Sequence, residues 1–236
     1  MQNCDLLWLL GSLRSFMKKK SNSIYNKVIK RIIDIICSFL AIVVLSVAYL
    51  PICLIVKLTS PGPVFFKQKR VGINKSYFNI LKFRTMRIDT PKDCPTHLLQ
   101  NPDQYITKVG KFLRKTSLDE LPQIFNIFKG DMSIIGPRPA LWNQDDLIEE
   151  RDKYGVNEFK PGLTGWAQVN GRDELPIPVK AKLDGEYVEK ISFLFDVKCL
   201  LLTVISVFKS DGVVEGGTGQ MTESEINKKV EKAEKR

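Results

Sequence analysis

A single long apolar segment constrains the fold of this chain more than any other feature. From Ile35 to Val56 the sequence runs for 22 residues without a charge, as IICSFLAIVVLSVAYLPICLIV. As an α-helix this segment would be about 33 Å long, which matches the apolar core of a lipid bilayer. Basic residues precede it and no small-residue cleavage site follows it, so it differs from a secretory signal peptide and we expect it to be retained.

Two topologies fit this segment. Lysine and arginine lie on both sides of it, at positions 18–20, 27, 30 and 31 and again at 57, 67, 69 and 70. A single span is expected to carry its basic excess on the cytoplasmic side alone. Pro51 deletes one backbone hydrogen bond and favours a bend. A bent helix that enters one leaflet and returns therefore stands beside a plain kinked transmembrane helix, which bilayers also tolerate.

The net charge and the composition limit which partners and which kinds of site are expected. The formal charge of +10 favours polyanions, namely nucleic acid, an anionic bilayer surface or phosphorylated substrates. The five cysteines form no CxxC pair, which argues against a disulfide framework and a zinc site. The only histidine, His97, lies in a polar, proline-containing stretch that reads as a loop, so a histidine-based triad is not indicated.

Short elements follow the apolar segment. Val64 to Phe66 reads as a strand, and residues 77–86 read as a second extended piece that carries Lys82 and Arg84. Residues 105–115 have a helical pattern with Arg114 on a basic face, which suits a membrane surface or an anionic ligand as well as plain solvent. The apolar stretch 191–209 is interrupted by Asp196 and Lys198 and suits interfacial burial or core packing.

Two adjacent carboxylates, Asp119 and Glu120, stand just ahead of an apolar helical pattern. The pattern predicts about three helical turns ending at Lys129, with Gly130 as the stop. Ser117 with Glu120 has capping-box spacing, whereas Asp119 as N-cap avoids a conflict with the proline at position 122. Either start places both carboxylates at the positive end of the helix dipole, which predicts lowered pKa values. Ordinary capping explains such a pair more often than a reactive centre does.

Two stretches rich in glycine and proline each present one arginine. These are residues 130–141 with Arg138 and residues 159–176 with Arg172. A planar guanidinium on a stiff loop is suited to bidentate binding of a diphosphate.

Six segments in order carry a resemblance to a known family: KRIIDIICSF, SPGPVFFKQKRVG, FRTM, SLDELPQ, GDMSIIGPRP and PGLTGWAQVNGR. From about Lys30 to Asp211 the chain resembles the bacterial sugar transferases, which are monotopic phosphoglycosyl transferases. The family commonly breaks its membrane helix at Ser-Pro, where this chain has Ser46 and Val47 with Pro51 about one turn later. Lys160 stands where the family commonly has arginine.

This resemblance implies transfer of a sugar 1-phosphate from a UDP-sugar to undecaprenyl phosphate, with release of UMP, at the start of exopolysaccharide, capsule or glycoprotein glycan synthesis. It implies that Asp119 is the nucleophile that forms an aspartyl-phosphosugar, and that Glu120 helps to hold Mg²⁺. Basic positions of the family's motifs, which we expect to contact substrate, are matched by Lys82, Arg84, Arg114, Arg138 and Arg172. It also implies a site that faces the cytoplasm at the bacterial inner membrane.

The expected fold is a mostly helical α/β, membrane-associated protein with a re-entrant helix, a small cytosolic catalytic body and interfacial amphipathic helices. The expected division is an N-terminal extension (1–29), the re-entrant helix (30–59), the transferase domain (60–211) and a charged, flexible tail (212–236). The alternatives are a membrane-tethered nucleic-acid binder and a non-catalytic scaffold. Nucleic acid is disfavoured, because the basic residues are spread among loops and no known nucleic-acid-binding fold is indicated. The sequence gives no sign of oligomeric state.

Overall fold

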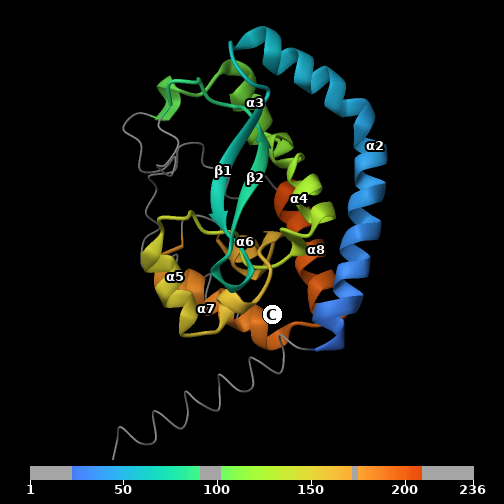
Figure 1. The fold of residues 1–236 in the computed structure, drawn as a ribbon, viewed down its shortest axis with the longest axis vertical. Coiled ribbons are helices and arrows are strands. Elements are labelled where there is room, and N and C mark those ends of the chain that lie inside the picture. Colours follow the sequence, from blue (N-terminus) through green and yellow to red (C-terminus); the bar gives the residue numbers. More distant parts are fainter. Residues whose placement is uncertain (1–22, 91–101, 172–174, 209–236) are drawn as a thin grey trace, which may run out of the picture.

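The computed structural model describes residues 23–90, 102–171 and 175–208, and these form a mostly helical α/β protein (Figure 1). One long apolar helix runs along the side of a body that holds two small two-stranded sheets and shorter helices. The mostly helical α/β class expected from the sequence is confirmed.

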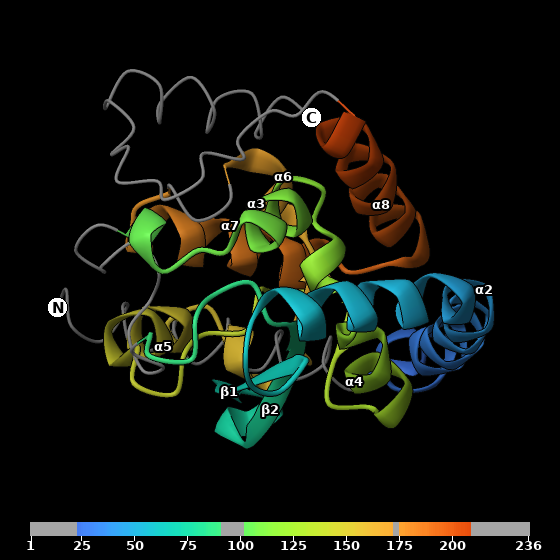
Figure 2. The same ribbon diagram turned by 90° about the horizontal axis from the view of Figure 1, so that it is seen from above.

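The apolar segment forms a single long helix. A π-helical turn, Tyr25–Ile29, leads into α2, Lys30–Thr59, and together they are long and apolar enough to cross a membrane. Figure 1 shows that α2 bends, and Figure 2 shows its later part crossing one end of the body. Pro51 lies inside the helix, where it lacks the N–H that would bond to the preceding turn. Large apolar side chains such as Val44, Val47 and Leu50 are more than 70% exposed, which suits contact with lipid.

The strands β1, Phe65–Val71, and β2, Tyr77–Phe83, form an antiparallel ribbon in which Phe66 pairs with Lys82. The second strand was expected from the sequence. The first is longer than the predicted run from Val64 to Phe66, because strand pairing continues through basic residues that alternate with more buried ones.

The predicted basic helix is α3, Lys108–Lys115, and the side chain of Thr107 caps its start by accepting from the Gly110 amide at 2.8 Å. Leu113 of α3 packs with Phe83 of β2 and Val56 of α2 in a small core. This core anchors the far end of α2 to the ribbon.

The helix start predicted around Asp119 and Glu120 is wrong in detail. A 3-10 turn, Leu118–Glu120 (η5), carries the two carboxylates, and the α-helix α4 begins only at Gln123 and ends at Lys129. Pro122 occupies the N-cap of α4, where its missing N–H costs no hydrogen bond, and neither Ser117 nor Asp119 forms a side-chain cap. The predicted stop is confirmed, since Gly130 adopts a left-handed conformation with φ 104°.

The second half of the body is built on β3, Ser133–Ile135, and β4, Gly162–Thr164, which pair in parallel. Both lie in the two glycine- and proline-rich stretches that the sequence indicated only as loops. The two stretches approach each other so closely that a Cβ at Gly162 would lie 2.1 Å from the amide nitrogen of Gly136.

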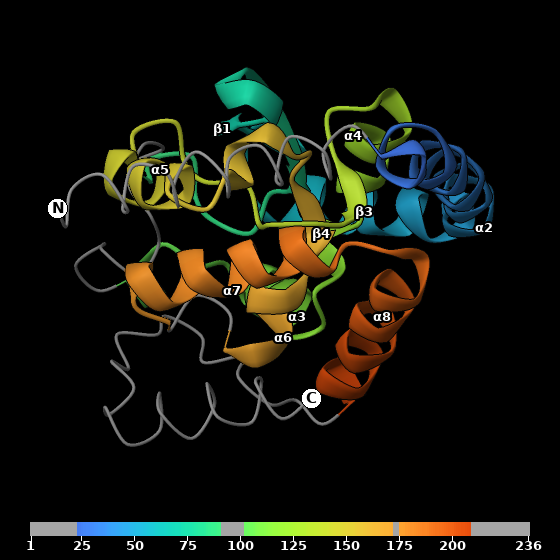
Figure 3. The same cartoon turned by 90° about the horizontal axis from the view of Figure 1, so that it is seen from below.

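Four helices belong to this half of the body. They are α5, Asp145–Asp152; α6, Trp166–Asn170; α7, Ile177–Lys190; and α8, Phe193–Phe208. Figure 3 shows α7 and α8 at a steep angle to each other, and β3 contacts both α8 and α2. The largest core cluster centres on Trp166, Leu183 and Tyr187. The start of α8 packs onto this core, while Phe193, Leu194 and Leu201 are more than half exposed.

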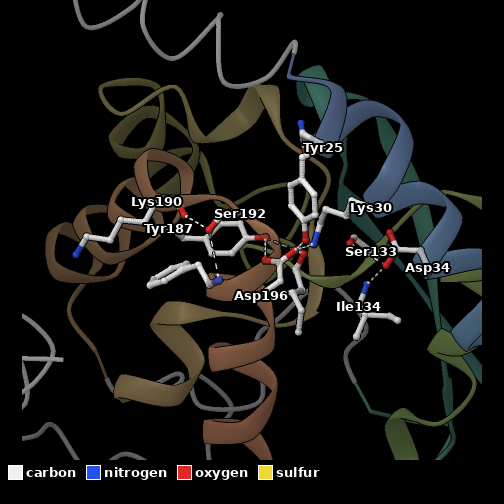
Figure 4. Close-up of polar contacts among 12 residues, drawn as sticks. Tyr25, Lys30, Asp34, Ser133, Ile134, Tyr187, Lys190, Ser192 and Asp196 are labelled. Carbon is white, nitrogen blue, oxygen red and sulfur yellow. Dashed lines mark hydrogen bonds and ion pairs between the residues drawn. The ribbon is translucent and has the colours of Figure 1, made fainter.

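A buried polar cluster joins the base of α2 to the body (Figure 4). The carboxylate of Asp196 on α8 accepts from three donors, which are the hydroxyls of Tyr25 and Tyr187 at 2.6 and 2.7 Å and the ammonium group of Lys30. One turn further along α2, Asp34 accepts from the Ser133 hydroxyl at 3.1 Å and the Ile134 amide at 3.0 Å. Since a buried charge is stable only when it is paired, these bonds fix where α2 leaves the body.

Candidate active site

The adjacent carboxylates Asp119 and Glu120 lie on the short turn η5 between α3 and α4. Asp119 is only 8% exposed, and Glu120 is also largely covered. Of the five basic residues predicted for the site, the structure describes Lys82, Arg84, Arg114 and Arg138, and it brings two of them, Lys82 and Arg138, into direct contact with Glu120.

Glu120 is held by two cations. Lys82, at the end of β2, donates to its Oε1 at 2.6 Å, and Arg138 donates to the same oxygen at 3.2 Å. Burial alone would raise the pKa of Glu120, but Lys82 and then Arg138 hold that pKa well below its usual range. Glu120 is therefore ionised at neutral pH. Both donors bond to Oε1, so Oε2 of Glu120 has no hydrogen bond among the residues that the structure describes.

Asp119 has a different environment. Within the described ranges, its carboxylate makes no hydrogen bond and no ion pair. Burial and the neighbouring charge of Glu120 raise its pKa, against the lowering effect of Lys82, Arg114 and Arg138. The lowered pKa predicted from a helix dipole is thus wrong for Asp119, because the turn is buried and no α-helix begins at this residue.

The other three basic residues predicted for the site differ in position. Arg114 lies close enough to affect Asp119 and donates to the hydroxyl of Thr85 at 2.9 Å. Arg84 points elsewhere, because its guanidinium donates to the carbonyls of Ser60 and Pro61, both at 2.6 Å. Arg172 lies outside the described residues.

The sequence did not reveal the side chains that hold this turn in place. Asn126 of α4 bonds to the backbone of β2, accepting from Leu81 N at 2.9 Å and donating to Asn79 O at 2.8 Å. Gln123, the first residue of α4, is buried, and its Nε2 has no partner in the part of the chain that is described. In a helix, Asn126 lies opposite the apolar pattern that includes Leu121, Phe125 and Phe128, so periodicity gave no signal that it is buried.

The two carboxylates fit a magnesium site in which the protein supplies only one or two ligands. Among the described residues there is no group of three or more acidic, histidine or cysteine side chains that could enclose a metal. Magnesium in phosphoryl-transfer sites is commonly held by one or two carboxylates together with substrate phosphates and water. The unbonded Oε2 of Glu120 and the unpaired carboxylate of Asp119 provide that smaller set.

Comparison with known proteins gives a consistent result. The family described as bacterial sugar transferase matches residues 25–210. The chain is 42% identical over 187 residues to an uncharacterized sugar transferase, EpsL, of Bacillus subtilis (strain 168), covering 79% of this chain and 90% of that protein.

Two further relatives have more informative names. One is the UDP-glucose:undecaprenyl-phosphate glucose-1-phosphate transferase of Escherichia coli (strain K12), 41% identical over 190 residues, which cover 78% of this chain and 41% of the relative. The other is the galactosyl transferase CpsE of Streptococcus agalactiae serotype III (strain NEM316), 40% identical over 167 residues, which cover 64% of this chain and 36% of the relative. The chain thus spans about two fifths of the length of these two proteins.

Proposed function

The chain belongs to the bacterial sugar transferase family and is a phosphoglycosyl transferase, and on that premise we propose that it transfers a sugar 1-phosphate from a UDP-sugar to undecaprenyl phosphate, releasing UMP. The names of relatives from E. coli, Xanthomonas campestris and Komagataeibacter xylinus support undecaprenyl phosphate as the acceptor. Relatives named for exopolysaccharide production and galactosyl transfer support a role at the start of exopolysaccharide or capsule synthesis.

One observation carries the mechanism that we propose. Two neighbouring carboxylates have opposite environments, since Glu120 is paired with two cations while Asp119 is buried and has no ion-pair partner among the residues that the structure describes. A capping role would engage backbone amides, and neither carboxylate does so. An unpaired carboxylate surrounded by cations is suited to attack phosphorus, because the cations offset the repulsion between the two anions.

In the first step, a carboxylate oxygen of Asp119 forms a bond to the phosphorus that bears the sugar. The bond from that phosphorus to the bridging oxygen breaks, and UMP leaves with the electron pair. In the second step, an oxygen of undecaprenyl phosphate attacks the same phosphorus, the bond to Asp119 breaks, and the carboxylate is regenerated. Two half-reactions allow a soluble donor and a lipid acceptor to use one site in turn.

Basic residues around the turn have distinct roles in this proposal. Lys82 and Arg138 hold Glu120, and in this proposal they also bind the diphosphate. Arg114 contributes positive charge beside Asp119. Arg172 remains a proposed substrate contact. Arg84 was predicted to bind substrate as well, but its two hydrogen bonds to Ser60 and Pro61, just after α2, favour a structural role.

Magnesium is the metal that we propose for this site, with Glu120 as a ligand through Oε2 and Asp119 beside it. When bound, the ion supplies positive charge to the phosphate oxygens. Lys82 and Arg138 retain Oε1 in this arrangement, so the chain's own cations keep Glu120 ionised and correctly turned.

We further propose that α2 enters the cytoplasmic leaflet of the bacterial inner membrane and returns, which leaves the active site facing the cytoplasm. Its bend, its internal proline and the basic residues at both ends support this topology. The exposed apolar residues of α8 support a second contact with the same surface. In this scheme residues 60–211 are the transferase domain, residues 1–29 an N-terminal extension and residues 212–236 a flexible tail.

The test is UMP release by the purified membrane protein in the presence of Mg²⁺, undecaprenyl phosphate and a panel of UDP-sugars. Asp119→Asn is expected to abolish release, whereas Asp145→Asn, which removes an exposed carboxylate on α5, should leave it unchanged. Chelation by EDTA should stop turnover and added Mg²⁺ should restore it.

Radiolabelled UDP-sugar supplied without acceptor should leave label on Asp119, detectable by mass spectrometry of the peptide. Full turnover by Asp119→Asn would contradict the nucleophile assignment. If the wild-type protein releases no UMP from any UDP-sugar, the proposed reaction is wrong.

A further inference from the structure

The membrane helix α2 touches the catalytic turn directly, through Tyr49. The hydroxyl of Tyr49 donates to the carbonyl oxygen of Leu121 at 2.8 Å. Leu121 follows Glu120 in the chain and closes the 3-10 turn that carries Asp119. Only one residue separates the bonded carbonyl from Asp119 along the backbone.

The ring of Tyr49 is fixed on two sides. It lies 5.4 Å from the ring of Phe83, which follows Lys82 at the end of β2, and 5.7 Å edge-on from the ring of Phe125 on α4. The side chain therefore stands between the strand that delivers Lys82 and the helix that follows the two carboxylates.

Helix α2 also contacts the C-terminal end of α4. The guanidinium of Arg31 donates to the carbonyls of Ile127 and Phe128, each at 2.7 Å. Arg31 and Tyr49 are 18 residues apart, or about 27 Å along a straight helix. One element thus holds the segment from Leu121 to Phe128 at both ends.

Tyr49 also lies next to the bend in α2. Pro51 follows two residues later, and its missing N–H leaves the carbonyl of Val47 without an intrahelical donor. The outward-facing neighbours Val47 and Leu50 are more than 70% exposed. Ile52 and Cys53 pack on the body beside Tyr49, and among the described residues around the bend it is Tyr49 that makes a polar contact with the catalytic segment.

From these contacts we infer that Tyr49 is a positioning residue, through which the membrane helix holds the turn of Asp119 in the geometry for attack on phosphorus. This inference rests on the proposed function. The hydroxyl acts on the backbone and touches no reacting atom, so its loss should slow the chemical step and leave binding of the UDP-sugar intact.

The experiment compares Tyr49→Phe with the wild-type protein in the first half-reaction, measured as a single turnover of UMP release without undecaprenyl phosphate. This variant keeps the ring between Phe83 and Phe125 and removes one hydrogen bond. The expected result is a single-turnover rate about 5- to 10-fold lower, with KM for the UDP-sugar within twofold of wild type. Tyr77→Phe is the matched control, since it removes the same atom from a tyrosine that is 57% exposed at the other end of β2.

Thermal unfolding of both variants ensures that rates are compared on folded protein. A wild-type single-turnover rate in Tyr49→Phe contradicts the inference, as does an equal loss in Tyr77→Phe. A rise in KM at an unchanged single-turnover rate contradicts it too, because Tyr49 would then act on binding. The two proposals fail differently: no UMP from the wild-type protein contradicts both, whereas UMP release at equal rates by wild type and Tyr49→Phe contradicts this inference alone.

Discussion

Replacing Lys82 by methionine tests how the two carboxylates differ. The Lys82 ammonium group lies 2.6 Å from Oε1 of Glu120, and both side chains are only about one fifth exposed. Methionine keeps most of the length of the side chain and removes the charge. Glu120 then retains only Arg138, at 3.2 Å, among its described ion-pair partners.

Two magnitudes follow from this geometry. A hydrogen bond to a charged group contributes about 1.5–3 kcal/mol, and 1 kcal/mol changes Tm by about 2–4 °C in a chain of 150–250 residues. The variant should therefore unfold about 3–12 °C lower than wild type. Lys82 is also the largest of the cationic influences that lower the pKa of Asp119, so its removal should raise that pKa.

The pH dependence gives the sharper result. If Asp119 must be ionised to attack phosphorus, kcat/KM falls on the acid side as pH drops through the pKa of Asp119. A single nearby charge typically moves a carboxyl pKa by about one unit or more, so the acid limb of Lys82→Met should move to higher pH by at least about one pH unit. Lys82→Arg keeps the charge and should restore most of the shift.

The assay is initial-rate UMP release between about pH 5 and 9, and thermal unfolding of each variant is measured alongside it. Lys67→Met is the control, because Lys67 is an exposed lysine on the neighbouring strand β1. An acid limb that stays at the wild-type position in Lys82→Met, despite the lowered Tm, would refute the claim that Lys82 controls the ionisation of Asp119.

Three further predictions concern stability and are checked by thermal unfolding. Asp119→Asn should raise Tm at neutral pH: burial raises the folded-state pKa of Asp119, so its ionised form destabilises the fold, and the gain should disappear as pH falls through that pKa. Gly110→Ala should lower Tm, although alanine normally favours a helix by up to about 1 kcal/mol, because the new Cβ would lie 1.9 Å from the carbonyl oxygen of Thr85. Arg151→Met should cost about 3–5 kcal/mol, since it leaves the buried carboxylate of Asp184 without its bonds at 2.6 and 2.9 Å. Adding Asp184→Leu to this variant should recover much of that loss, and a double variant no more stable than the single one would contradict the explanation.

The sequence by itself determined the local features of this protein. An uncharged run of 22 residues requires a long apolar helix, and the alternation and periodicity near residues 77–86 and 105–115 gave β2 and α3. Gly130 could be predicted as the helix stop because the left-handed conformation costs glycine less free energy than it costs other residues. The ordered motifs gave the family, which the comparisons confirmed.

What only the tertiary structure decided is the state of each charged group. Asp119 and Glu120 are neighbours with the same local pattern, yet within the described part of the chain only Glu120 has ion-pair partners, because Lys82 and Arg138 reach it from 38 and 18 positions away. A helix-start argument assigns both carboxylates the same lowered pKa, and burial reverses it for Asp119. Arg84 was indistinguishable from Lys82 in the sequence and turned toward Ser60 and Pro61 instead. Burial and pairing depend on which distant segments meet, and residue order along one segment does not contain that information.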